Sequence, residues 1–247
     1  MQIKKWLALL LAAVMLVTIL PGCGSDSYEG ESSGSKRKRD TRSAGLYEPG
    51  TKEMIKSWDE LVEEGTVMVI NGEVISGWVH GTQRNTSSDK LYGDLVLHKN
   101  VTIIGEGAFA YCNRLTGITL PDSVTSIEDR AFDDCAFLTN ITIPNSVTNI
   151  GGFAFRGCSS ITSITIPNSV INIGDSAFNG CKNLTNVTIG EGVISIGRLV
   201  FDHCPNLTCI TFTGTKEEWE NIEKWAGSFT DVPAEKLVCS DGAVNLH

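Results

Sequence analysis

One pattern recurs every 23 residues between Leu95 and Phe212, and it constrains the fold more than any other feature of the chain. A phenylalanine marks each copy, a cysteine follows it by three residues, and a leucine or isoleucine follows by three more. The three series are Phe109, Phe132, Phe155, Phe178 and Phe201; Cys112, Cys135, Cys158, Cys181 and Cys204; and Leu115, Leu138, Ile161, Leu184 and Leu207. A constant period over five copies predicts a stacked solenoid, in which each turn buries its apolar side against its neighbours.

Each copy opens with an L-x-x-I-x-I phrase that is typical of a short strand. In the copy that begins at Leu138, alternation predicts that Ile141 and Ile143 point inward and that Asn140 and Thr142 point outward. An earlier, degenerate turn fits the same register at Leu95, Leu97, Val101 and Ile104.

The A-F-x-x-C segment of each copy is too short for a full helix, so we expect a helical turn on the convex side. A glycine often precedes this segment, at a place where we expect the chain to turn with positive φ. These glycines are Gly105, Gly151, Gly174 and Gly197.

The wording I-P-x-S-V-T-x-I-G-x-x-A-F-x-G-C-x-x-L-T-x-I-T closely resembles the BspA-type leucine-rich repeat, also called the Treponema pallidum type, over about half of the chain. The resemblance implies a leucine-rich repeat solenoid, a right-handed α/β or β solenoid of about five to six repeats with a cap at each end. A parallel sheet of short strands would form one face and short helical turns the other. The resemblance also implies a surface-exposed bacterial protein, and some relatives bind host matrix proteins or other cells.

The chain divides into five expected parts. They are a lipoprotein signal peptide (1–22), a flexible tether (23–50), an N-terminal cap (51–92), the solenoid (93–213) and a C-terminal cap (214–247).

The amino terminus carries a leader pattern. Lys4 and Lys5 precede an apolar run from Trp6 to Leu20, which is shorter than the roughly 20 residues that span a bilayer. The run ends in Leu-Pro-Gly-Cys, which resembles the lipobox of bacterial lipoproteins, with Cys23 as the lipidated residue. Lipidation would hold the chain at a membrane surface. The alternative is an ordinary secretory signal with an unrelated cysteine.

The tether is rich in Gly, Ser and charge and carries the basic run Lys36-Arg37-Lys38-Arg39. We interpret this run as a solvated linker, and attraction to anionic lipid or wall polymers is the alternative. Loss of Lys4 and Lys5 with the leader takes the net charge from −9 to −11. This acidity argues against nucleic-acid binding by the folded part.

Capping boxes mark both predicted caps. Ser57 and Glu60 open a short helix, and Asn71-Gly72 suits the turn of a hairpin that follows it. Thr215 and Glu218 open a second helix, and Trp219, Ile222 and Trp225 follow at helical spacing, so we expect one apolar stripe docked on the last turn. We expect Trp58 and Trp78 to cover the N-terminal end of the solenoid, and the alternative is that they contact a ligand. For the C-terminal stripe, the alternative is an exposed partner site at Trp219 and Trp225. We expect the C-terminal residues 234–247 to add an edge strand.

The cysteines of the repeat occupy an inward, small-residue position, so we expect a ladder of buried thiols. Their odd number and parallel side chains argue against disulfides among them. In an exported protein, Cys209 and Cys239 can pair and staple the C-terminal cap. Zinc ligation by His203, Cys204 and Cys209 lacks a fourth ligand and the usual spacing. We find no nucleophile, metalloprotease or phosphate-loop motif, so the sequence predicts neither an enzyme nor a cofactor or metal site.

The remaining candidate site is the outward side of the strands. Its columns contain small, uncharged hydrogen-bonding groups: Thr119, Thr142, Thr165, Thr188 and Thr211 in one, and Gly117, Asn140, Ser163, Asn186 and Cys209 in the next, followed by Pro121, Pro144 and Pro167. Such a surface suits an extended peptide, a glycan or a protein surface through weak, multivalent contacts. It lacks Trp, Tyr and Arg anchors, and threonine also occurs simply because it favours strands.

We therefore predict a lipid-anchored, non-catalytic cell-surface protein that acts in adhesion or recognition. Its partners would be the membrane, through the anchor, and a host extracellular-matrix protein, another cell-surface protein or a glycan. The alternatives are a structural scaffold of the cell envelope and a non-catalytic subunit that presents substrate to a secreted enzyme.

Overall fold

The structure is a computed structural model that describes residues 43–47, 54–63, 69–70, 73–74, 91–225, 227–229 and 232–246. All of them belong to one compact unit, residues 36–247. The predicted leader, Cys23, the basic run at 36–39, Asn71-Gly72 and Trp78 lie outside the described residues. None of the described helices is long and apolar enough to cross a membrane.

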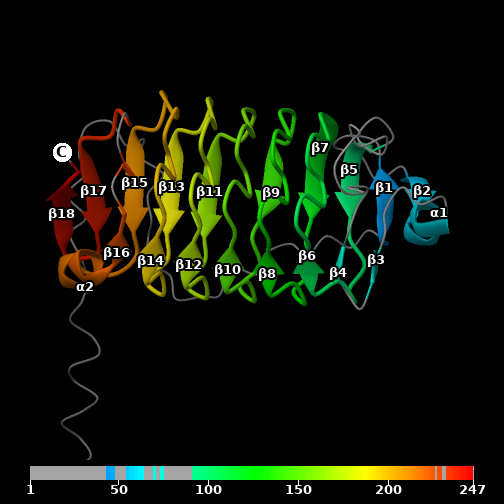
Figure 1. The fold of residues 1–247 in the computed structure, drawn as a ribbon, viewed down its shortest axis with the longest axis horizontal. Helices are drawn as coiled ribbons and strands as arrows, with labels where there is room; N and C mark the ends of the chain where they lie inside the picture. The colour runs from blue at the N-terminus through cyan, green and yellow to red at the C-terminus, as the bar shows by residue number, and fades with distance from the viewer. Residues whose placement is uncertain are drawn as a thin grey trace, which may run out of the picture. The chain divides into compact units, whose positions relative to one another are not determined.

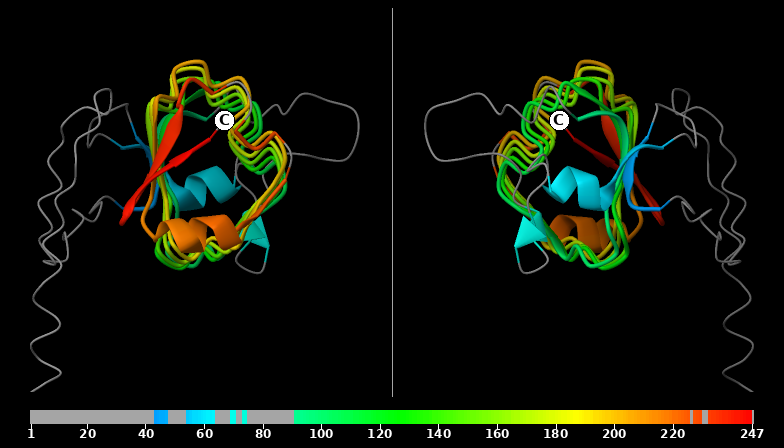
Figure 2. Two further views of the ribbon diagram at one scale, coloured as in Figure 1. Left: turned by 90° about the vertical axis from the view of Figure 1, so that its left-hand side faces the viewer. Right: turned by 90° about the vertical axis from the view of Figure 1, so that its right-hand side faces the viewer.

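The predicted solenoid is confirmed. Each turn contributes one longer strand and one two-residue strand, and successive turns stack in register (Figures 1 and 2). The longer strands of the repeat are β5 (Tyr92–Val96), β7 (Arg114–Thr119), β9 (Asn140–Thr142), β11 (Ser163–Ile166), β13 (Asn186–Ile189) and β15 (Cys209–Phe212). They pair in parallel within two groups, β5 to β9 and β11 to β15.

A second parallel sheet, which the sequence analysis did not identify, runs along the solenoid. Its members are β6 (Ile103–Ile104), β8 (Ser126–Ile127), β10 (Asn149–Ile150), β12 (Asn172–Ile173), β14 (Ser195–Ile196) and β16 (Glu223–Lys224), extended by the hairpin of β3 (Val69–Ile70) and β4 (Glu73–Val74). The isoleucine of each repeat strand from β8 to β14 is buried, so these strands supply the inward residues expected from the sequence.

The A-F-x-x-C segments are turns, not helices. Their amide groups alternate between two kinds of partner. The Phe132 N–H donates to the Ala154 carbonyl of the next repeat over 2.7 Å, whereas the Cys135 N–H donates to the Phe132 carbonyl three residues back over 3.2 Å. Every second amide is therefore used to join repeats, and no continuous helix forms.

The glycines before these turns are not at positive φ, which corrects the sequence-based expectation. Their role is steric. A Cβ on Gly151 would lie 2.5 Å from the backbone nitrogen of Asp129, and one on Gly174 would lie 2.4 Å from that of Gly152. Adjacent turns approach too closely here for any side chain.

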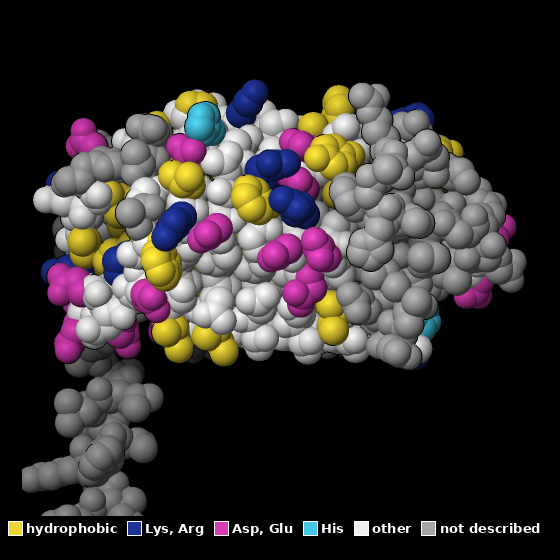
Figure 3. Space-filling model, in the orientation of Figure 1, with side chains coloured by type: hydrophobic (Ala, Val, Ile, Leu, Met, Phe, Trp, Pro, Cys, Tyr) yellow, Lys and Arg dark blue, Asp and Glu magenta, His cyan; other side chains and the backbone are white. Residues whose placement is uncertain are grey.

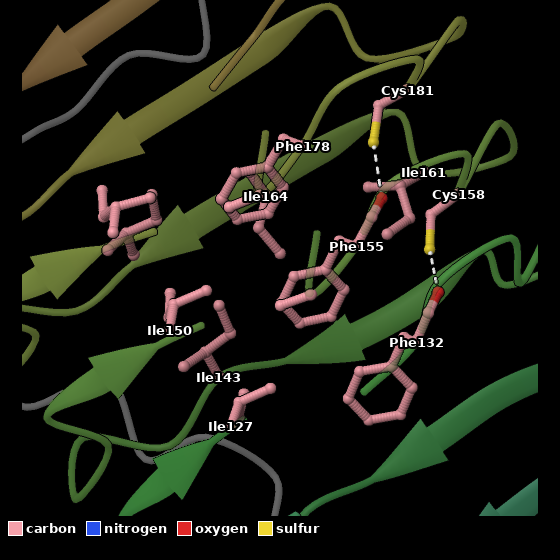
Figure 4. Packing of buried hydrophobic residues seen from close by; sticks show 14 of the residues in the cluster. Ile127, Phe132, Ile143, Ile150, Phe155, Cys158, Ile161, Ile164, Phe178 and Cys181 are labelled. Atoms are coloured by element: carbon pink, nitrogen blue, oxygen red, sulfur yellow. Dashed lines mark hydrogen bonds between the residues drawn. The ribbon is translucent and has the colours of Figure 1, made fainter. Parts of the chain in front are cut away.

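The core consists of aligned side-chain ladders. The five phenylalanine rings stack with centroids 5.2–5.6 Å apart, and all five are fully buried. Each repeat cysteine from Cys135 to Cys204 donates its S–H to the carbonyl of a phenylalanine 26 residues earlier (Figure 4). The predicted ladder of free, buried thiols is thus confirmed for the five repeat cysteines.

Both ends of the stack are covered by non-repeat elements. At the N-terminal end, β1 (Gly45–Tyr47) and β2 (Met54–Ser57) extend the sheet of β5, and α1 (Trp58–Glu63) buries Leu61 against the core. The predicted capping box is present, because the Glu60 N–H donates to Ser57 Oγ and the Ser57 N–H to Glu60 Oε2. In the views along the solenoid axis in Figure 2, α1 and the C-terminal cap helix both lie across the solenoid.

At the C-terminal end, α2 (Lys216–Asn221) begins at the predicted Thr215–Glu218 capping box. Trp219 and Ile222 are buried, and Phe229 continues the phenylalanine ladder with its ring 5.6 Å from that of Phe201. The helix ends at Asn221, so Trp225 does not belong to its apolar stripe and is 47% exposed. The tail forms β17 (Lys236–Cys239), parallel to β15, and β18 (Gly242–Asn245), which confirms the predicted edge strand.

Candidate functional site

The candidate site is the outward side of β7, β9, β11, β13 and β15, called here the strand face. All eight residues predicted for it lie there and are exposed or half-buried: Thr119, Asn140, Thr142, Ser163, Thr165, Asn186, Thr188 and Thr211. Strand pairing aligns Thr119 with Thr142, and Thr165 with Thr188 and Thr211. The threonines therefore form straight columns that cross the strands at about 4.8 Å per repeat.

The strand face consists of two ladders, not the single sheet expected. β9 ends the sheet that begins at the N-terminal cap, and β11 begins the sheet that continues to β18. At the junction Ile141 of β9 is only half-buried, whereas its counterparts Ile118 and Ile164 are buried.

The hydroxyl groups of the strand face differ in their availability. Directly before β9 and β13, the Thr139 and Thr185 hydroxyls donate to the carbonyls of Thr116 and Thr162 over 2.9 and 3.0 Å. Asn140 and Asn186 in turn donate to those two hydroxyls over 3.0 Å each.

A second group of hydroxyls has no such partners. Within the part of the chain that the structure describes, the hydroxyls of Thr142, Ser163, Thr165 and Thr188 form no hydrogen bond to protein. These hydroxyls can donate to and accept from an external ligand without breaking an internal contact. They form the part of the strand face that is chemically available.

The N-terminal end of the strand face carries groups that the sequence analysis missed. The Arg114 guanidinium lies 5.2 Å from the ring centroid of Tyr92, and the Thr116 hydroxyl donates to Asp94 over 2.9 Å. Strand β5 aligns Tyr92 with Arg114 and Asp94 with Gly117. The irregular sequence of this first turn concealed the alignment, because Tyr92 lies 22 residues before Arg114 and the 23-residue period would instead have set Leu91 beside it.

Three predicted members of the columns are less accessible than expected. Pro144 and Pro167 are buried, and so is Gly117. A Cβ on Gly117 would lie 2.7 Å from the Asp94 carboxylate, so Asp94 occupies the space above this glycine. The proline column is therefore not part of the accessible surface, except at half-buried Pro121.

The predicted Cys209–Cys239 disulfide is wrong in this structure, because Cys239 is a free, buried thiol. Parallel pairing sets Thr211 beside Val238, which places Cys239 beside Phe212 and Cys209 about three residues away along the strands. The two side chains also occupy opposite faces, since Cys209 alternates with the buried Ile210 whereas Cys239 is itself buried. Such a geometry does not permit a disulfide without backbone movement.

Charged groups gather on the side of the A-F-x-x-C turns, called here the turn face. Arg156 donates to both carboxylate oxygens of Asp133, from Nε over 2.7 Å and from Nη2 over 2.8 Å. Asp133 is 1% exposed, and its burial raises the pKa of the carboxyl while the bond to Arg156 lowers it. Bidentate pairing of this kind compensates a buried carboxylate.

The described residues do not form a metal site. No group of three or more potential metal ligands comes together in that part of the chain. His203 Nδ1 lies 2.7 Å from Asp202 on the turn face, whereas Cys204 is buried and Cys209 is on the strand face. The three ligands considered for zinc are thus separated by the fold.

The model of one protein family matches residues 91–226 in six copies, and it is described as the BspA type leucine-rich repeat region. No curated protein matches the chain.

Several solved structures are similar to the chain. A leucine-rich repeat protein of T. pallidum is 36% identical over 47% of this chain and 54% of its own, with a TM-score of 0.46. A leucine-rich repeat protein of Eubacterium ventriosum is 22% identical over 56% and 42%, with a TM-score of 0.49. A leucine-rich cell surface protein of Faecalibacterium prausnitzii is 23% identical over 54% and 63%, with a TM-score of 0.27. The chain thus spans between 42% and 63% of the length of these proteins.

Proposed function

The chain belongs to the BspA-type leucine-rich repeat family, and from that premise we propose that it is a lipid-anchored, non-catalytic protein of the bacterial cell surface that binds other proteins or cells. The binding surface in this proposal is the strand face. Its ligand is a host matrix protein, a protein of a neighbouring cell or a glycan.

The observation that carries this proposal is the set of available hydroxyls on the strand face. Thr142, Thr165 and Thr188 come from three different strands, and none of their hydroxyls is used within the described part of the chain. Side chains that existed only to favour strand formation would have no need to align their hydroxyls in columns on one uncharged stretch of the surface, from Thr142 to Thr188. A row of neutral hydrogen-bonding groups suits repeated weak contacts with an extended or repetitive ligand.

The proposed location rests on separate evidence. The leader pattern and the Leu-Pro-Gly-Cys motif at Cys23 support export and lipidation, and one similar protein is described as a cell surface protein. Incorporation of radiolabelled fatty acid into the parent chain, but not into Cys23→Ala, would support the anchor. Equal labelling of both would contradict it.

Binding is tested with the full chain against a panel of extracellular-matrix proteins and cell-wall glycans. One variant changes Thr142, Thr165 and Thr188 together to Glu, which adds three negative charges to the strand face. The matched control changes Thr102, Thr125 and Thr148 to Glu, because these threonines occupy equivalent positions of three repeats beside the second sheet. Circular dichroism verifies that both variants remain folded.

We expect saturable binding by the parent and by the control, and at least a tenfold loss in the strand-face variant. Equal loss in both variants would move the site away from the strand face. Absence of binding to the whole panel would favour the structural scaffold of the envelope, and isolation of a fixed envelope partner would identify it.

A further inference from the structure

The turn face contains residues in a backbone conformation that most side chains avoid. In each repeat, the residue two before and the residue two after the phenylalanine have positive φ. The non-glycine members are Arg130, Phe153, Ser176 and Leu199 before the phenylalanine, and Tyr111, Asp134 and His203 after it, with φ between 53° and 61°. A bulky residue in this left-handed region is strained.

The fold itself does not require these side chains. Glycine occupies the same positions in other turns, as Gly107 before one phenylalanine and as Gly157 and Gly180 after two others. Tyr111 and Leu199 are 42% and 41% exposed, so burial does not compensate their strain. Strain that the fold could avoid, at exposed aromatic and charged residues, points to a role in binding.

The strained residues form a cluster with the composition of an interface. The half-buried ring of Phe153 has the Arg130 guanidinium 5.3 Å and the Arg156 guanidinium 5.2 Å from its centroid. Arg130 forms no ion pair with any described residue, although acidic side chains are abundant in this chain. Arginine and aromatic residues dominate the centres of protein interfaces, and the strand face lacks them over most of its length.

An acidic cluster adjoins this basic one. Glu106, Glu128 and Asp129 line one hollow on the turn face, and Asp129 directly precedes Arg130. Figure 3 shows acidic side chains gathered beside basic and hydrophobic side chains on this surface. A two-fold axis between the two clusters would place the arginines of one molecule against the acids of another and leave Phe153 in the contact. Such a surface is complementary to itself.

We propose that the turn face is a self-association surface, on which two copies of this chain pair through Arg130, Phe153 and the acidic cluster of Glu106, Glu128 and Asp129. This surface is separate from the strand face, so pairing would leave the proposed ligand-binding surface accessible. Two strand faces on one dimer would increase the avidity of weak contacts.

The test uses full-length chains with two different affinity tags, co-expressed and purified in a mild detergent. Arg130→Glu and Glu106→Arg each reverse one charge at an exposed position. We expect differently tagged parent chains to co-purify. When two tagged copies of the same variant are co-expressed, the amount recovered together should be at least tenfold lower. Mixing the two variants should restore recovery, because each contact then again joins opposite charges.

Three results would overturn the proposal. If differently tagged parent chains do not co-purify, the chain does not self-associate through the turn face. Undiminished recovery of either variant with itself would place the association elsewhere, including in the leader. Loss in both single variants without recovery in the mixture would contradict the two-fold arrangement.

A second variant tests the strain directly. Phe153→Gly should lower co-purification at least tenfold, while the thermal unfolding midpoint by circular dichroism stays the same or rises, because glycine accepts the left-handed conformation. A purely structural Phe153 would give the reverse, with a lowered midpoint and unchanged association.

Discussion

The thiol of Cys158 donates a hydrogen bond to the carbonyl oxygen of Phe132, with 3.1 Å between sulfur and oxygen. The two residues belong to adjacent repeats, and the same contact recurs three more times along the core. Side-chain hydrogen bonds therefore join adjacent repeats in addition to the backbone hydrogen bonds. Each turn buries its apolar side chains only against its neighbours, so such contacts hold the stack together.

Removal of this thiol tests its contribution to stability. Cys158→Ala removes the sulfur and leaves the Phe132 carbonyl without its side-chain partner, so we expect a loss of about 1–2 kcal/mol. Urea unfolding followed by circular dichroism measures the change. A variant as stable as the parent would show that the thiol ladder only fills space.

The same thiols predict a loss of stability in alkali. Burial raises the pKa of Cys204 to about 11 and that of Cys112 to about 12, and it raises the pKa of Cys158 well above 9.0, the ordinary value. The unfolded chain therefore releases thiol protons first, so stability is complete below pH 9.0 and decreases as the pH rises toward the folded values.

Comparison of the parent with Cys158→Ala isolates this effect from other groups that titrate in alkali. One thiol accounts for at most about 1.4 kcal/mol per pH unit above its unfolded pKa. The stability difference between the two proteins should therefore shrink between pH 8 and pH 10. A difference that stays constant over this range would contradict the raised pKa.

The close approach of adjacent turns predicts that replacement by alanine destabilises the protein more at Gly151 than at Gly180. A Cβ at Gly151 would lie 2.5 Å from a backbone nitrogen of the preceding repeat, so Gly151→Ala should cost about 2 kcal/mol or more. Gly180→Ala is the matched control, because the nearest atom would be 3.7 Å away and only its φ of +73° opposes a side chain, at about 1 kcal/mol. Thermal unfolding of both variants measures the difference. Equal tolerance would disprove the steric role.

The buried ion pair of the turn face predicts an acid-dependent effect. Arg156→Met removes the partner of the nearly inaccessible Asp133 carboxylate, and we expect a loss of about 2 kcal/mol at pH 7. Without Arg156, burial and the nearby Asp134 raise the pKa of Asp133 against only the effect of Arg130, so its folded pKa moves further above the ordinary value of 3.8. Stability of the variant is then lost as pH rises through that folded value.

The stability gap between Arg156→Met and the parent should therefore narrow as the pH falls toward 3.8. Addition of Asp133→Asn to the variant should recover part of the loss at pH 7, because it removes the uncompensated charge. A gap that does not change with pH would mean that Arg156 acts through packing alone.

The repeat determined which features could be predicted from the sequence. Alternation assigned inward and outward residues correctly in β11 and β13, whereas Gly117 of β7 is buried and Ile141 of β9 is only half-buried. The capping boxes at Ser57 and Thr215 identified the two cap helices. These signals are local, since each depends on residues that are neighbours in the chain.

Features that depend on contacts between repeats were missed. A two-residue strand such as β10 is too short to show alternation, and its partners lie 23 residues away on either side. The amides that keep the turns from becoming helical also bond to the next repeat. Phe153 and Leu199 carry no glycine-like signal of a left-handed conformation, which only the backbone reveals.

The most direct test of the central claim is site-specific photocrosslinking to the ligand that binds most tightly in the panel. A photoreactive amino acid replaces either Thr165 on the strand face or Thr148 beside the second sheet, and both positions are exposed. The account predicts a ligand crosslink from position 165 and none from position 148. A crosslink from position 148 alone would contradict the strand face as the binding surface.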